Sequence, residues 1–141
     1  MMEVRQERTG WRDEGISRRH RLWGYDCPAL DIDFLMIEYD RAKAVALVEY
    51  KREGAGEPKL SHPTLRALKD LADRAGLPAF VCYYAGDFDW WFPIPLNYRA
   101  RLICPGWDYL KEHEWAEVLY RCRGRQLPLE VIRSIAEASC N

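Results

Sequence analysis

The sequence predicts an α/β domain in which a mixed four-stranded sheet is flanked by helices. Two apolar segments, 31–39 and 44–51, are joined by a short polar connection, a pattern that predicts an antiparallel hairpin. An amphipathic segment follows the hairpin, and two further β-rich segments follow that segment. The 141 residues are 48% hydrophobic, so we expect one domain over 1–141 with a core of its own.

The hairpin is predicted to lie between two helices. The first helix spans about 12–23, where charged residues alternate with a few apolar ones. The second begins with Ser61 as its N-cap and Pro63 in its first turn. Apolar side chains recur every three or four positions along it, and Gly76 ends it. The chain therefore begins α-β-β-α.

Two more strands and two more helices are predicted in the C-terminal half. The strands span about 77–84 and 90–95. The second of them contains two prolines, which cannot donate to a neighbour, so we expect it at the edge of the sheet. Helical periodicity then marks about 107–122 and 128–139. The predicted order of elements is α-β-β-α-β-β-α-α.

Composition excludes several classes of protein. The net charge of −1 argues against a generic polyanion-binding protein. No apolar run reaches the roughly 18 residues that a membrane span needs, and the first ten residues are polar and charged. We therefore expect no membrane association and a cytoplasmic location. The five cysteines are scattered without a paired spacing, which indicates reduced thiols rather than a disulfide framework or a zinc site.

The charges are unevenly distributed along the chain. Residues 1–23 contain six arginines, whereas 26–40 contain five acidic residues and no lysine or arginine. An acidic pocket flanked by arginines suits a metal site that faces a phosphate backbone, although ordinary solvated surfaces explain the charges as well. The candidate phosphate contacts, which a charged helix face would equally explain, are Arg18, Arg19, His20 and Arg21.

Three side chains of the hairpin form the candidate catalytic site. Side chains alternate between the two faces of a strand, so Glu49 and Lys51 project from the same face. The hairpin can bring Asp33 beside them. Two carboxylates suit Mg²⁺ or Mn²⁺, which keep positions open for water and phosphate, and a lysine can stabilise the charge that develops on a phosphoryl group.

The pattern of Asp33 followed by Glu49-Tyr50-Lys51 resembles the D…(D/E)-x-K signature of the PD-(D/E)XK nuclease superfamily, which includes restriction endonucleases and Holliday junction resolvases. The α-β-β-α-β order over about 12–96 is similar to that superfamily's core, and the helices of about 107–139 lie outside it. The resemblance implies a restriction-endonuclease-like fold, with Asp33 and Glu49 as metal ligands and Lys51 as a catalytic residue. Asp31 competes for the role of Asp33, and Glu14 is the candidate for a further metal ligand from the first helix.

The resemblance also implies a function. We expect an endonuclease that depends on Mg²⁺ or Mn²⁺. Its expected substrate is nucleic acid, with DNA favoured over RNA, and its expected assembly is a homodimer. Its small size suits a structure-selective enzyme such as a junction resolvase, or a nuclease of phage or mobile-element origin. The alternatives are a catalytically inactive binding or regulatory module on the same fold, and an unrelated α+β domain. Trp90, Trp91 and Phe92 could stack on unpaired bases, or pack in the core or an interface.

Overall fold

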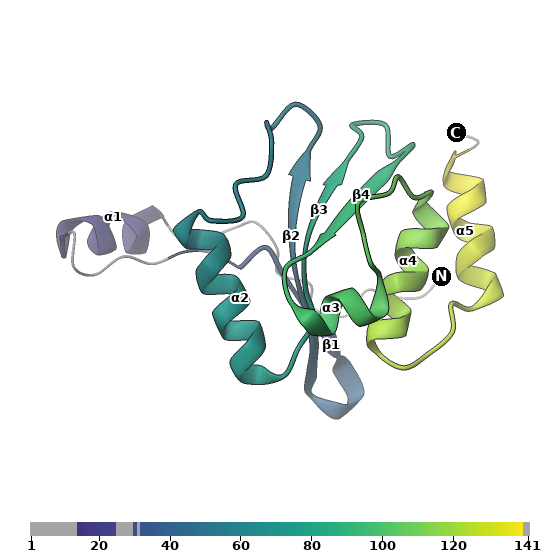
Figure 1. Ribbon diagram of the computed structural model, residues 1–141, viewed down its shortest axis with the longest axis horizontal. Helices are drawn as coiled ribbons and strands as arrows, with labels where there is room; N and C mark the ends of the chain where they lie inside the picture. The colour runs from purple at the N-terminus through teal and green to yellow at the C-terminus, as the bar shows by residue number, and fades with distance from the viewer. Residues whose placement is uncertain (1–13, 25–29, 31, 140–141) are drawn as a thin grey trace.

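The fold is a four-stranded mixed sheet with helices on both faces, as predicted (Figure 1). The computed structural model describes residues 14–24, 30 and 32–139. In the strand order β1-β2-β3-β4, the pairs β1–β2 and β3–β4 are antiparallel and β2–β3 is parallel. The elements are α1 Glu14–Leu22, β1 Phe34–Glu38, η1 Tyr39–Arg41, β2 Lys43–Arg52, α2 Pro63–Ala75, β3 Ala79–Tyr84, β4 Trp91–Pro95, α3 Tyr98–Ile103, α4 Glu112–Cys122 and α5 Leu129–Ser139.

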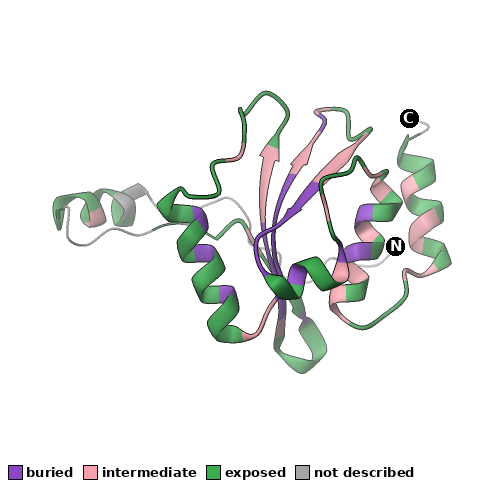
Figure 2. Ribbon diagram, viewed as in Figure 1, coloured by how far each residue is buried: buried purple, intermediate pink, exposed green. Residues whose placement is uncertain are grey.

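Each face of the sheet has its own core, because side chains alternate along β2 and β3. The helix α2 covers one face, and α3 with α4 covers the other (Figure 1). Burial is concentrated in the middle strands and on the inner sides of α2 and α4, while α1 and α5 contain no residue that is fully buried among those described (Figure 2). On the α2 side the buried residues are Leu47, Leu65, Leu68, Ala72, Ala79, Val81 and Leu96, and on the α4 side they are Val48, Phe80, Cys82, Ala100, Cys104, Trp115 and Val118.

The hairpin is confirmed, but the predicted strand 31–39 is too long. Residues 32 and 33 precede β1, and Tyr39–Arg41 form a turn of 3-10 helix. Ala42 then adopts a left-handed conformation, with φ of 51°, and its N–H bonds to the carbonyl of Tyr39. This tight turn reverses the chain and sets the start of β2 at Lys43.

The boundaries of α2 differ from the prediction only at the N-cap. His62, rather than Ser61, caps the helix, because its Nδ1 accepts the backbone N–H of Thr64 at 3.2 Å. Pro63 occupies the first helical position, where its missing N–H has no partner to lose. Gly76 ends the helix with φ of 73°, as predicted from its freedom at positive φ.

The helix α3 was not predicted, and a buried asparagine holds it in place. The side chain of Asn97 is almost fully buried and caps α3, since its Oδ1 accepts from Ala100 N–H at 3.0 Å and from Ala79 N–H at 3.2 Å. Its Nδ2 donates to Leu77 O at 2.8 Å and to Asp73 Oδ1 at 3.0 Å. One amide therefore ties together α2, β3 and α3.

The helix α4 begins at Glu112, so the predicted start near 107 is wrong. The segment before it is extended along β4, where Trp91 and Leu110 exchange both backbone hydrogen bonds, at 2.8 and 2.7 Å. Gly106 permits this close approach with φ of 79°, because a Cβ there would lie 2.8 Å from the carbonyl oxygen of Pro93. None of the helices in the described part of the chain is long and apolar enough to cross a membrane.

Candidate active site

The hairpin brings Asp33 and Glu49 together on the face of the sheet that α2 partly covers. Phe34 pairs with Val48 and Leu35 with Leu47, so the next pair in this antiparallel register is Asp33 opposite Glu49. Directly opposed residues project from the same face. The carboxylate of Asp33 is fixed there because its Oδ2 accepts the backbone N–H of Tyr50 at 3.1 Å.

Glu49 lies between two charges of opposite sign. Burial raises its pKa, the nearby carboxylate of Asp33 raises it further, and the ammonium of Lys51 lowers it. The Nζ of Lys51 is 4.0 Å from Oε1 of Glu49, and the exposed fractions of the two side chains are 37% and 21%. The pKa of Glu49 is raised despite this lysine, because burial and the charge of Asp33 together outweigh it.

Tyr50, between the two site residues, anchors β2 from the opposite face. Its ring contacts Phe34, Tyr84, Trp91 and Trp115 edge to face, and its hydroxyl accepts from Nε1 of Trp115 at 3.0 Å. Tyr50 also donates its backbone N–H to Asp33. The aromatic packing of its ring therefore fixes the part of β2 that carries Glu49 and Lys51 and that holds Asp33. The site is thus held by a rigid element rather than by a loop.

A hollow of about 210 Å³ lies beside Lys51, at the carboxyl end of β2. Lys51, Lys59, His62 and Tyr83 contribute to its lining, together with the loop that enters α2. The hydroxyl of Tyr83 donates to the carbonyl of Gly56 at 2.8 Å and holds that loop against β3. Lys59 is exposed, and its place beside Lys51 follows from the β2–α2–β3 crossover, whose loop returns over the carboxyl end of β2.

The aromatic segment 90–92 divides between the two faces of the sheet. Trp91 packs against Tyr50 on the α4 side, as the core interpretation predicted. On the other side, Trp90 and Phe92 contact Tyr109 with ring centroids 5.1 and 4.9 Å apart. Trp107 and Tyr109 remain more than half exposed. These four rings line a second hollow, of about 440 Å³, which shares Tyr83 with the hollow beside Lys51.

The other predicted site residues are not brought to the hairpin by any described contact. Asp31 and the side chain of Glu14 lie outside the described residues, so their assignments stay predictions. The helix α1 is set apart from the sheet, beyond α2 (Figure 1). On this helix Arg18, Arg19 and Arg21 are exposed, and the ring of His20 lies 4.6 Å from that of Trp23.

Comparison of the chain with protein-family models, with curated proteins and with solved structures finds no match. The restriction-endonuclease-like identity of the fold therefore stays a prediction.

Proposed function

We propose that this protein is a divalent-cation-dependent nuclease that hydrolyses phosphodiester bonds at Asp33, Glu49 and Lys51. The proposal depends on the hydrogen bond from Tyr50 N–H to Oδ2 of Asp33. This bond holds the carboxylate of Asp33 beside that of Glu49, which lies opposite it in the hairpin. Lys51, with its Nζ 4.0 Å from Glu49, supplies the cation of the set. Two carboxylates that can hold a cation and one ammonium group are the kinds of side chain that such a reaction uses.

The two carboxylates fit a hard divalent cation. Their oxygens are the ligands that Mg²⁺ and Mn²⁺ prefer, and a cation would offset the repulsion by which the charge of Asp33 adds to the burial that raises the pKa of Glu49. Among residues 14–24, 30 and 32–139 there is no cluster of three or more candidate metal-ligating side chains. Two carboxylates suffice, because Mg²⁺ is usually held by one or two carboxylates, with waters and substrate phosphates completing its coordination. Such a cation would supply Lewis-acid activation of the phosphoryl group and of the attacking water.

The remaining roles belong to the chain's own residues. Lys51 stabilises the negative charge that grows on the phosphoryl oxygens as the bond breaks. Lys59 lines the same hollow as Lys51, so a substrate phosphate there meets two ammonium groups. Glu49 is partly buried, and interactions between charges are stronger there than in bulk water.

Binding of a divalent cation should strengthen as pH rises through the pKa of Glu49. In the cation-free protein this pKa is raised above 4.5, so the folded state favours the protonated form of Glu49. The protonated side chain stabilises the folded state at low pH, and this stabilisation is lost as pH rises through the raised pKa. Ligation requires the carboxylate, hence protons and cation compete for it. As pH rises above 4.5 the apparent Mn²⁺ affinity should increase, by up to about tenfold per pH unit, and level off once Glu49 is ionised. Calorimetric titration at several pH values from 4.5 upward tests this, and an affinity that does not change with pH would contradict it.

The direct test is cleavage of a panel of nucleic acids. Four-way junctions, flaps, duplexes and single strands of DNA and of RNA are incubated with the protein in Mg²⁺, in Mn²⁺ or in EDTA. The proposal expects cleavage of at least one DNA substrate that requires the cation and stops in EDTA. Cleavage that persists in EDTA, or no cleavage of any substrate, would overturn it.

The exposed aromatic rings favour one alternative, a binding or regulatory module without activity. Trp107 and Tyr109 are 55% and 69% exposed, and large exposed aromatic groups mark contact surfaces. In that case Glu49 and Lys51 form only an ion pair. The panel separates the two functions, because the module would bind a partner and cleave none of the substrates.

A further inference from the structure

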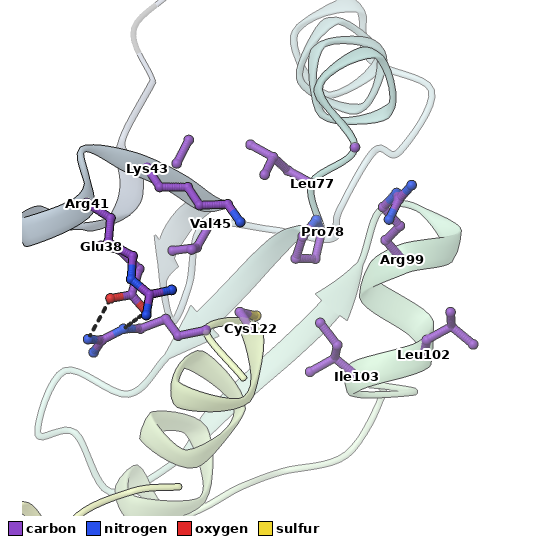
Figure 3. Close-up of a pocket in the computed structure, with 13 residues that line it drawn as sticks. Glu38, Arg41, Lys43, Val45, Leu77, Pro78, Arg99, Leu102, Ile103 and Cys122 are labelled. Atoms are coloured by element: carbon purple, nitrogen blue, oxygen red, sulfur yellow. Dashed lines mark hydrogen bonds and ion pairs between the residues drawn. The ribbon is translucent and has the colours of Figure 1, made fainter. Parts of the chain in front are cut away.

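Another pocket, separate from the hollow beside Lys51 and from the hollow lined by aromatic rings, lies at the other end of β2, away from the candidate active site. It has a volume of about 380 Å³ and is formed where the β1–β2 turn, the end of α2, α3 and the end of α4 meet (Figure 3). Lys43 lines it and Lys51 does not, and these residues are eight positions apart on one strand. At about 3.3 Å per residue the separation is roughly 26 Å. The two sites are therefore distinct.

Cationic side chains dominate the pocket. Arg41, Lys43, Arg99 and Arg123 contribute to its lining, against the single carboxylate of Glu38. That carboxylate is already neutralised, since Nε of Arg123 lies 3.2 Å and Nε of Arg125 3.4 Å from its Oε1. These arginines also lower the pKa of Glu38, so it is ionised at neutral pH. The pocket thus retains a positive charge that no acidic side chain in its lining offsets.

Two of the cations face one another across the pocket. Lys43 extends from the start of β2, and Arg99 stands on the opposite side, on α3 (Figure 3). Within the described part of the chain, neither side chain forms a hydrogen bond or an ion pair. Arg99 lies over Gly76, the C-cap of α2, and Arg123 is the C-cap of α4. Each arginine thus lies at the C-terminal end of a helix, where the partial negative charge of the helix favours a cation.

The floor between the cations is apolar. Val45, Leu77, Pro78 and Ile103 form it, and Leu102 extends it at the rim (Figure 3). A volume near 380 Å³, an apolar floor and a few convergent charges are typical of small-molecule sites. Inorganic phosphate would engage the cations and leave the floor uncovered, whereas an apolar molecule would leave the cations without a partner.

We propose that this pocket binds an organic phosphate, such as a mononucleotide, with Lys43 and Arg99 holding the phosphate and the apolar floor holding the rest of the molecule. Ammonium and guanidinium groups are the donors that recognise phosphate in proteins. The proposal is independent of the nuclease activity, because it uses none of the hairpin carboxylates.

Calorimetric titration with AMP, phenyl phosphate, inorganic phosphate and adenosine tests the proposal on the full chain in EDTA, so that no divalent cation at the candidate active site contributes to binding. AMP and phenyl phosphate should bind more tightly than inorganic phosphate or adenosine. In the variant Lys43→Gln/Arg99→Gln their affinity should fall at least about tenfold, because two charge-assisted contacts are lost. The matched control, Arg66→Gln/Arg133→Gln, removes the same charge from exposed positions of α2 and α5 and should bind like the parent.

Three results would overturn the proposal. They are no binding of either organic phosphate, an equal loss of affinity in both double variants, and Lys43- and Arg99-dependent binding of a short oligonucleotide but not of AMP. The last result would assign the cations to a nucleic-acid backbone instead. Both side chains are exposed, so we expect the variant to fold, and Lys43→Gln alone serves if the double variant does not.

Discussion

The variant Asp33→Asn is expected to lose cation-dependent cleavage by at least about a hundredfold, which is about 2.7 kcal/mol of transition-state stabilisation. Asparagine retains an oxygen that can accept the N–H of Tyr50, so the hairpin keeps its geometry while the site loses one negative charge. The loss of activity would then report the charge of Asp33 rather than its place in the strand. Initial rates on the best substrate of the panel measure the effect.

Two measurements separate a catalytic loss from a structural one. The exposed carboxylate of Asp70 on α2 forms an ion pair with Arg74, and Asp70→Asn should cleave like the parent. In Asp33→Asn the pKa of Glu49 should also fall, since the charge of Asp33 contributes to raising it. Cleavage by Asp33→Asn at the parental rate would remove Asp33 from the site.

The variant Asn97→Ala is expected to lower the free energy of unfolding by about 3 kcal/mol, the largest effect we predict for a residue outside the active site. The side chain is 1% exposed and makes four hydrogen bonds. Alanine removes the cap of α3 and leaves the backbone N–H of Ala79 and the carbonyl of Leu77 without this partner. For a chain of this length the melting temperature should fall by about 10 °C.

The variant Asn97→Ser distinguishes the two parts of this effect. Serine retains an oxygen that can cap α3 but supplies no amide donor for Leu77 or Asp73. Its stability should lie between those of the parent and Asn97→Ala in urea denaturation. If Asn97→Ala is as stable as the parent, the buried amide does not connect α2, β3 and α3 as we describe.

The hairpin and its site residues could be predicted because their signals are local. Alternation places Glu49 and Lys51 on one face, and a short polar connection predicts the antiparallel partner strand. That Asp33 rather than a neighbouring residue faces Glu49 depends on the turn. The 3-10 turn and the left-handed Ala42 pair Glu38 with Lys43, and an irregularity between Met36 and Ile37 then shifts the register by one residue, so that Asp33 rather than Ile32 lies opposite Glu49. No residue pattern in the sequence marks this shift.

The features that were missed depend on contacts between distant residues. Asn97 precedes a short helix, and its preference for N-cap positions was the available signal, but six residues are too few for apolar periodicity. Glu38 and Arg123 are 85 positions apart, so the pocket that both line follows only from the packing of α4. Ser61 is a better N-cap by preference, yet His62 takes the role because it directly precedes Pro63 at the first helical position.

The most direct test of the central claim is a calorimetric titration of Mn²⁺ into the parent protein and the variant Asp33→Asn/Glu49→Gln. A site built from these two carboxylates predicts one Mn²⁺ per chain in the parent and none in the variant, with both proteins folded. If the variant binds Mn²⁺ with the parent's affinity and stoichiometry, or if the parent binds none, then Asp33 and Glu49 do not form a metal site.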